Sequence, residues 1–224
     1  MASPSGSTSA ALPPLGALSA RYESNGNPGS IGHDSTGGWS YGTYQIATLT
    51  GTFTDFMNFL RKQYPALAQP LDAAGGPTAA TSGTQQFQAA WKSEAQQSAA
   101  QFQQAQHDYI QTTHYDVQVA KLQANFGLDV NQRSRALQNA VWSMAVQMGN
   151  VTQTIFRNVL KNVSSVASMD DAQLIPLLYA ERSKVDVYFA ASTPKVKASV
   201  LNRFQQEQND ALQMLQAERA AGGN

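Results

Sequence analysis

Apolar residues recur every three or four positions along much of the chain, which is the spacing of an amphipathic helix. The segment 52–64 carries this stripe most clearly, with its apolar positions at Phe53, Phe56, Met57 and Leu60. Aromatic residues recur with the same spacing over 84–112, at Phe87, Trp91, Phe102 and Tyr109. We therefore expect two helices here, each with one face packed on a core.

One further segment is apolar on nearly all sides. The stretch 132–148 (QRSRALQNAVWSMAVQM) predicts a central, buried helix that stops at Gly149. Shorter amphipathic patterns predict the remaining helices at 15–23, 113–125, 151–164, 170–189 and 194–219. The Pro-, Gly- and Ala-rich stretch 65–83 is interpreted as a connector.

The region 24–46 breaks this helical pattern. It is rich in glycine, and its apolar residues alternate around Trp39, Tyr41, Tyr44 and Ile46, which is typical of short strands. The predicted fold class is therefore mainly α, with a small β-hairpin or loop element at about 30–46. Residues 1–14 are interpreted as a flexible linker or a cloning remnant, and 15–224 as a single domain.

Composition narrows the classes of function. The chain has 15 basic and 15 acidic residues among 224, and charged residues make up 13% of it, against about 25% in typical soluble domains. No basic surplus predicts binding to nucleic acid. The absence of cysteine excludes disulfides and thiolate metal sites. No apolar run approaches the ~20 residues of a membrane span, and the N-terminus lacks the pattern of a signal peptide.

Two acids stand out in the glycine-rich region. Glu23 lies at the predicted end of a short helix, and Asp34 follows eleven residues later in GHDSTGG. Aromatic neighbours raise the pKa of a carboxylic acid by desolvation, which suits a general acid. Two carboxyl groups about 6.5–9.5 Å apart leave room for the water of an inverting hydrolysis. The alternatives are a helix-terminal Glu that bonds loop amides and an Asp that forms a turn.

Other reactive residues form no recognisable site. The three histidines, His33, His107 and His114, lack the spacing of a zinc site, and Ser40 lacks the context of a serine hydrolase. No phosphate-binding loop is present. From these absences together we expect no cofactor and no metal. Asp55 and Asp116 are alternative second acids, although Asp55 lies early in a helix, where a structural role is expected.

The sequence ARYESNGNPGSIG, followed by an Asp, a Gly-Gly pair and SYGTYQ, resembles the C-terminal peptidoglycan-hydrolase domain of type VI secretion spike proteins and related phage lysins. Its Glu-Ser and Asn-Pro-Gly pattern is also similar to the catalytic stretch of goose-type lysozymes and soluble lytic transglycosylases. RSRALQNAVWSMAVQMG, YAERSKVDVYF and NRFQQEQNDAL resemble later segments of the first family, so that the resemblance covers about 15–215. It implies a lysozyme-like, two-lobed fold.

The resemblance also implies a muramidase that cleaves the β-1,4 bond between N-acetylmuramic acid and N-acetylglucosamine. Glu23 would be the general acid and Asp34 the general base, with inversion. The residues that would bind the sugar are Tyr41, Gly42, Tyr44, Gln45 and, from the central helix, Gln147. For the two tyrosines, plain packing of a strand is the alternative.

Two other functions stay open. The first is lytic transglycosylation with Glu23 as the only catalytic acid, although lytic transglycosylases carry Gly-Leu-Met-Gln where this chain has Gly42-Thr43-Tyr44-Gln45. The second is a non-catalytic module that binds cell-wall sugars. A chitosanase-like substrate is a further variant, which the zero net charge disfavours. The expected partners are peptidoglycan glycan strands and, by analogy, an inhibitory immunity protein, with the chain itself a monomer. Action in the periplasm would require delivery by a secretion apparatus, a phage particle or lysis.

Overall fold

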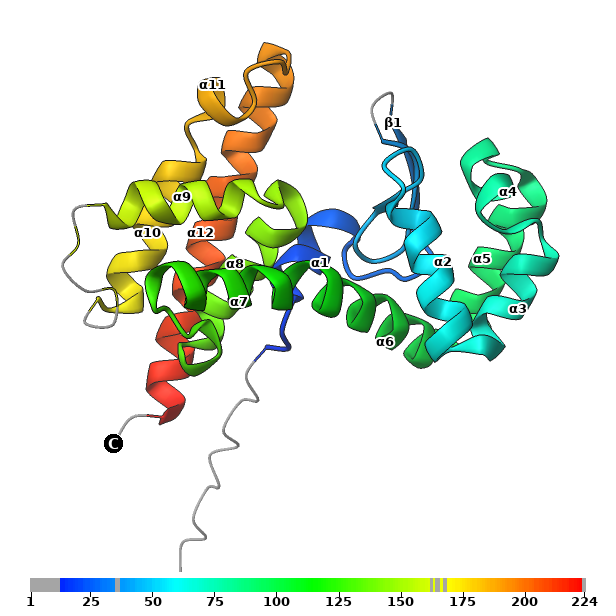
Figure 1. Cartoon of the computed structure of the whole chain (residues 1–224), viewed down its shortest axis with the longest axis horizontal. Helices are drawn as coiled ribbons and strands as arrows, with labels where there is room; N and C mark the ends of the chain where they lie inside the picture. The colour runs from blue at the N-terminus through cyan, green and yellow to red at the C-terminus, as the bar shows by residue number, and fades with distance from the viewer. Residues whose placement is uncertain (1–12, 35–36, 162, 164–165, 167–168, 223–224) are drawn as a thin grey trace, which may run out of the picture. The chain divides into compact units, whose positions relative to one another are not determined.

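The computed structural model describes residues 13–34, 37–161, 163, 166 and 169–222. The chain divides into two compact units, one made of Ser19–Val117 and the other of Met1–Leu18 with Gln118–Asn224 (Figure 1). Each unit is considered by itself. Apart from Pro13 and Pro14, the predicted linker at 1–14 lies outside the described residues.

The unit Ser19–Val117 contains the small β element that the alternating pattern predicts. Its strands β1 (Ile31–Asp34), β2 (Gly38–Tyr41) and β3 (Ile46–Ala47) form an antiparallel sheet in the order β1-β2-β3 (Figure 1). Ile31 is paired with Tyr41, and Tyr41 with Ile46. The expectation of a mainly α fold with one short β element at about 30–46 is thus confirmed.

An aromatic core fills this unit. The ring centroids of Tyr41 and Phe53 lie 5.0 Å apart, and those of Trp91 and Phe102 lie 4.7 Å apart. Helix α2 (Thr52–Gln63) buries the whole predicted stripe, Phe53, Phe56, Met57 and Leu60. The aromatic residues at helical spacing are therefore core residues, as predicted.

The stretch 65–83 is not a plain connector, and this prediction is wrong. It forms helix α3 (Pro65–Ala73) and helix α4 (Gly76–Ser82), which are separated at Gly75 with φ 101°. Proline is accepted in the first turn of a helix, and alanine has the strongest helix propensity, so the composition that resembled a linker also permits two short helices.

The single helix expected over 84–112 is interrupted. Helix α5 (Gln85–Gln97) ends at Ser98, whose φ of −121° and ψ of 32° are not helical, and α6 (Ala99–Ile110) begins directly after it. A π-helical turn (Gln111–Tyr115) then leads into α7 (Asp116–Phe126). Serine competes for backbone hydrogen bonds and so favours such breaks. Thr84 caps α5 by accepting a hydrogen bond from the N–H of Phe87.

The second unit is arranged around a buried helix. In α8 (Arg135–Met148), every residue from Ala136 to Ala145 is buried, which confirms the prediction of a central helix. Helices α9, α10 and α12 pack against it. The elements of this unit after α7 are a 3-10 turn (Val130–Gln132), α8, α9 (Val151–Leu160), α10 (Asp171–Arg182), α11 (Val185–Tyr188) and α12 (Pro194–Gly222). The helix predicted over 170–189 is therefore two helices.

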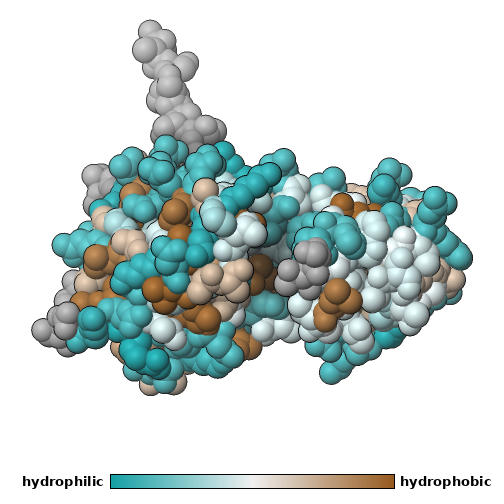
Figure 2. Space-filling model, turned by 90° about the horizontal axis from the view of Figure 1, so that it is seen from above, coloured by the Kyte–Doolittle hydropathy of each residue, from teal (hydrophilic) through white to brown (hydrophobic). Residues whose placement is uncertain are grey.

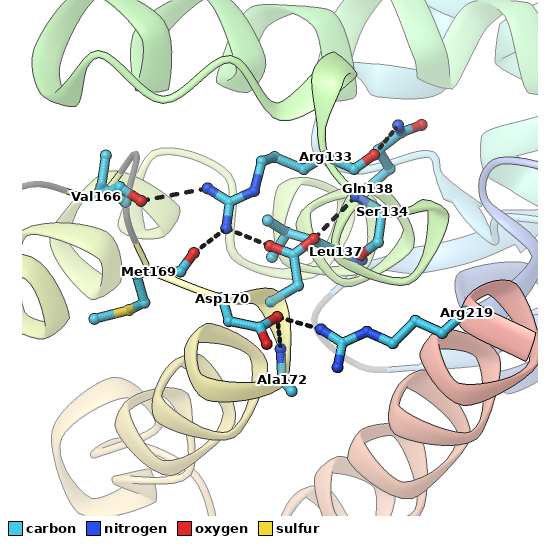
Figure 3. Close-up of polar contacts among 10 residues, drawn as sticks. Arg133, Ser134, Leu137, Gln138, Val166, Met169, Asp170, Ala172 and Arg219 are labelled. Atoms are coloured by element: carbon cyan, nitrogen blue, oxygen red, sulfur yellow. Dashed lines mark hydrogen bonds and ion pairs between the residues drawn. The ribbon is translucent and has the colours of Figure 1, made fainter. Parts of the chain in front are cut away.

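Polar contacts hold the helix ends of this unit together (Figure 3). Asp171, at the start of α10, accepts a 2.9 Å hydrogen bond from the N–H of Ser134 and lies 2.5 Å from the guanidinium of Arg133. Asp170 caps the same helix and pairs with Arg219 of α12. The starts of α8 and α10 are thus joined by buried, charge-assisted bonds.

The face of the molecule drawn in Figure 2 is mostly polar. Figure 2 shows that hydrophobic residues on one face form separate patches among hydrophilic ones. The large hydrophobic side chains that are most exposed, Leu49 and Val187, lie on a loop and on α11. Within the part of the chain that the structure describes, no helix combines the length and the apolar character needed to cross a membrane.

Candidate functional site

Glu23 lies in the last turn of the helix α1 (Ala17–Ser24), and its side chain is half-buried. The helix ends because Asn25 adopts a left-handed conformation with φ 53°. The N–H of Gly26 then donates to the oxygen of Ala20 (3.0 Å), and the N–H of Asn25 to that of Arg21 (3.2 Å). The bond from the left-handed Asn25 back to Arg21 is that of the αL type of helix end, which fixes the direction of the chain directly after the carboxylate.

Ser24, the neighbour of Glu23, ties the helix end to the turn after β2. Its hydroxyl donates a 2.9 Å hydrogen bond to the carbonyl of Thr43 and accepts one of 3.2 Å from the N–H of Asn27. The backbone that carries Glu23 is therefore fixed to the sheet segment by the adjacent residue.

Gln106 also holds the glycine-rich loop in place, and we call its bonds to Thr43 and Pro28 the brace; its role was not predicted from the sequence. Its side chain is completely buried; its Oε1 accepts a 2.7 Å bond from the N–H of Thr43, and its Nε2 donates to the carbonyl of Pro28 at 3.1 Å. Trp91 donates to the same carbonyl at 3.0 Å. The sequence pattern could have identified it as a buried residue, because Gln106 lies four residues after Phe102 and three before Tyr109, on the apolar face of α6. A polar residue at such a position needs buried partners.

Gly42 is required by this brace. Its φ is 82°, and a Cβ at this position would lie 2.3 Å from Oε1 of Gln106. Gln45, which also has a positive φ of 48°, donates to the carbonyl of Gly42 (3.0 Å) and accepts from the hydroxyl of Ser40 (2.7 Å). Both residues, which were predicted to line a sugar cleft, thus shape the turn after β2. Their role towards a sugar stays a prediction.

We expect Gln106→Ala to lower the free energy of unfolding by about 1–3 kcal/mol, because it leaves the N–H of Thr43 without its buried partner. Urea denaturation measures this change. Gln104→Ala, on the exposed side of α6, is the matched control and should change stability by less than about 0.5 kcal/mol. Equal losses from both variants would contradict the role of the brace.

Tyr41 and Tyr44 are both buried. The Tyr41 side chain is 0% exposed, its hydroxyl donates a 3.0 Å bond to the carbonyl of Ala80, and burial raises its pKa to about 12. The Tyr44 side chain is 6% exposed, and its ring centroid lies 6.5 Å from that of His107. A fully enclosed ring offers no face for stacking on a sugar, so the structure favours the alternative of strand packing for Tyr41.

Asp34 ends β1 and is exposed. Its Oδ1 accepts a 2.7 Å hydrogen bond from the N–H of Gly37, which is the bond that an aspartate in a turn forms. Asp34 therefore does form a turn, as the alternative interpretation expects. Its role as a general base stays a prediction. Asp55 lies in the first turn of α2 and is exposed, and Asp116 begins α7.

Gln147 belongs to the other unit, near the end of α8. Its Oε1 accepts a 2.7 Å hydrogen bond from the guanidinium of Arg182, so its carbonyl oxygen is already used within that unit. Its expected contact with a sugar stays a prediction. In the described ranges, no three or more His, Asp or Glu side chains come together as a metal site would require.

The fold is thus a mainly helical one in which a carboxylate stands at a braced helix end beside a small antiparallel sheet. Residues 15–208 match the family model of the type VI secretion system spike protein VgrG3-like, C-terminal. The chain belongs to this family. It is also 33% identical over 168 residues to the type VI secretion system spike protein VgrG3 of Vibrio cholerae serotype O1. That match covers 74% of this chain but 15% of the relative.

Proposed function

We propose that this chain is a muramidase, a glycoside hydrolase that cleaves the β-1,4 bond between N-acetylmuramic acid and N-acetylglucosamine. The observation that carries the proposal is the braced position of Glu23. Ser24 and Gln106 both bond to the backbone of Thr43, so that the helix end bearing the carboxyl group is fixed to the glycine-rich loop. A proton donor must be held in place relative to the bond it cleaves. Hydrogen bonds made by the residues that support it, here Ser24 and Gln106, supply such rigidity.

The proposed reaction uses Glu23 as the general acid. Its carboxyl proton passes to the glycosidic oxygen, the bond from this oxygen to the anomeric carbon breaks, and the developing cation is attacked by water on the opposite face. Asp34 accepts a proton from that water. A new hydroxyl forms on the anomeric carbon with inverted configuration. Tyr44 and Gln45 are the remaining proposed contacts for the sugar in this unit, and Gly42 and Tyr41 support the turn and the strand that carry them.

Asp34→Asn is expected to lower the rate of peptidoglycan hydrolysis by about 10²–10⁴-fold, because an amide cannot accept the proton of the water. The amide oxygen can still accept the hydrogen bond from Gly37, so the turn should persist. Release of soluble fragments from purified peptidoglycan measures the rate. Asp55→Asn is the control and should keep the rate within about twofold; near-normal activity of Asp34→Asn would remove Asp34 from the mechanism.

Lytic transglycosylation is the second candidate. It is favoured by the bond between Asp34 and the N–H of Gly37, because an aspartate that serves only the turn leaves Glu23 as the single acid. In that reaction, a hydroxyl of the substrate replaces the water and an anhydro sugar forms. The two candidates differ in their products, and a normal rate for Asp34→Asn would favour this one.

Membership in a spike-protein family supports delivery by a secretion apparatus. We propose that the substrate is the peptidoglycan of the periplasm and that the chain acts there as a monomer. An enzyme of this kind would endanger the cell that makes it, so an inhibitory immunity protein is a proposed partner.

A further inference from the structure

A pocket of about 490 Å³ lies within the unit Ser19–Val117, and the proposed mechanism does not use it. It is lined by side chains from the end of α2, the residue between α2 and α3, the end of α6 and the π-helical turn: Phe59, Gln63, Tyr64, Asp108, Gln111 and Thr112. Its volume is in the range of pockets that bind small molecules. π-Helical turns occur often at functional sites.

Tyr64 provides a fixed aromatic wall of this pocket. Its ring centroid lies 6.0 Å from that of Phe59, and its hydroxyl donates a hydrogen bond to Oδ2 of Asp108. This bond raises the pKa of Tyr64 to about 12. A ring held at both its edge and its hydroxyl loses little conformational entropy when a ligand stacks on it.

Both carboxylate oxygens of Asp108 already accept hydrogen bonds within this unit. The second carboxylate oxygen of Asp108 accepts a 2.6 Å hydrogen bond from Nε2 of Gln104. Among the described lining residues there is no lysine or arginine. With both oxygens of Asp108 engaged, the groups left to meet a ligand are two aromatic rings, the amide of Gln63 and the part of the Gln111 amide that does not bond to the carboxylate of Asp116. The carboxylate keeps its negative charge, which disfavours an anion, and the rings and amides suit a neutral polar ring.

The pocket lies on a different face of α6 from the brace at the glycine-rich loop. Asp108 follows Gln106 by two residues, which places their side chains about 200° apart around the helix. The side chain of Gln106 faces Thr43 and Pro28, whereas that of Asp108 faces Tyr64. The pocket is therefore a separate site on the same helix.

We infer that this pocket is a second, non-catalytic saccharide-binding site, in which the ring of Tyr64 stacks on a pyranose and the amides of Gln63 and Gln111 bond to its hydroxyl and acetamido groups. That the sugar is an N-acetylhexosamine rests on the proposed function. Aromatic faces beside amide groups provide the apolar and hydrogen-bonding contacts that a neutral sugar offers. Such a site would keep the enzyme on a glycan strand between cleavages.

The test is a titration of the ¹⁵N-labelled full chain, carrying Glu23→Gln, with the tetrasaccharide of β-1,4-linked N-acetylglucosamine. We expect saturable shifts of the backbone amide signals of Gln111 and Thr112. Tyr64→Ala should weaken this response about fivefold or more. Tyr188→Ala is the matched control, because the hydroxyl of Tyr188 also donates to a carboxylate, that of Glu181 at 2.7 Å, in the other unit. It should leave the response unchanged.

Each result of this titration decides the inference. Tyr64→Phe keeps the ring and loses the bond to Asp108, so it tests the site even if Tyr64→Ala fails to fold. Its affinity for the tetrasaccharide should lie between those of the parent and of Tyr64→Ala. No shift at Gln111 and Thr112, or an equal response in Tyr64→Ala that has folded normally, would overturn the site. Because Glu23 is replaced throughout, these outcomes do not depend on turnover, and hydrolysis by the unmodified chain tests the proposed function separately.

Discussion

Glu23→Gln is expected to lower the rate of fragment release from peptidoglycan by about 10²–10⁴-fold, with little change in the free energy of unfolding. The amide of glutamine matches the carboxyl group in size but cannot donate the proton that the leaving oxygen needs, and general acid catalysis contributes a factor of this size. The fold should persist, because the contacts that end α1 and fasten it are made by other groups: the backbone of Asn25 and Gly26 and the side chain of Ser24.

The matched control is Glu94→Gln, the same chemical change in α5 of the same unit. It should keep the rate within about twofold and the stability within about 0.5 kcal/mol. If Glu23→Gln released fragments as fast as the parent, Glu23 would not be the acid. If it unfolded instead, the carboxylate would be a structural group.

Arg182→Ala is expected to lower the free energy of unfolding by about 3–5 kcal/mol, the largest stability change that we predict. Arg182 and Glu207 are both 0% exposed, and Nη1 of Arg182 lies 3.7 Å from Oε1 of Glu207. The guanidinium also lies 4.0 Å from the ring centroid of Phe204 and donates to Oε1 of Gln147 at 2.7 Å. Removing it takes away the fully buried positive partner of Glu207, leaving the partly exposed Arg203, whose Nε lies 3.8 Å from Oε2 of Glu207. It also opens a cavity beside the ring.

Urea denaturation of three variants separates these contributions. The double variant Arg182→Met with Glu207→Leu should be more stable than Arg182→Ala, because it leaves no buried carboxylate, and Arg203, the other partner of Glu207, is partly exposed to water. Arg219→Ala is the matched control: its partner Asp170 is half-exposed, so it should cost about 1 kcal/mol or less. A change in Arg182→Ala no larger than that of Arg219→Ala would contradict the importance of the buried pair.

The sequence contained this ion pair only as a pattern of positions. Glu207 lies three residues after Phe204 and four before Ala211, both of which are buried, so it falls on the apolar face of α12. A charged residue there requires a partner. Arg182 supplies it from α10, and this pairing depends on the packing of two helices, which periodicity does not reveal.

Local patterns predicted most of the fold. The central helix α8, the stripe of α2 and the short strands all follow from spacing of apolar residues over a few turns. The errors arose where composition was ambiguous: alanine and proline in 65–83 fit a linker as well as they fit α3 and α4, and Ser98 interrupts a helix that the aromatic spacing continues across.

The candidate site was predictable only in part. Glu23 and the loop after it could be singled out because an acid at a helix end followed by glycines is unusual. Gln106 is one of many glutamines, and its bonds to Pro28 and Thr43 join residues 78 and 63 positions away along the chain. Tyr41 looked like a stacking residue because sequence alone does not reveal that Ala80 and the aromatic core enclose it.

The most direct test is mass spectrometry of the soluble products formed when the chain is incubated with purified peptidoglycan, with Glu23→Gln in parallel. We predict fragments that end in reducing N-acetylmuramic acid and that are absent from the Glu23→Gln sample. Anhydro-muramic ends would instead establish the transglycosylase and return Asp34 to its turn. Intact peptidoglycan after incubation with the unmodified chain would contradict the enzymatic account.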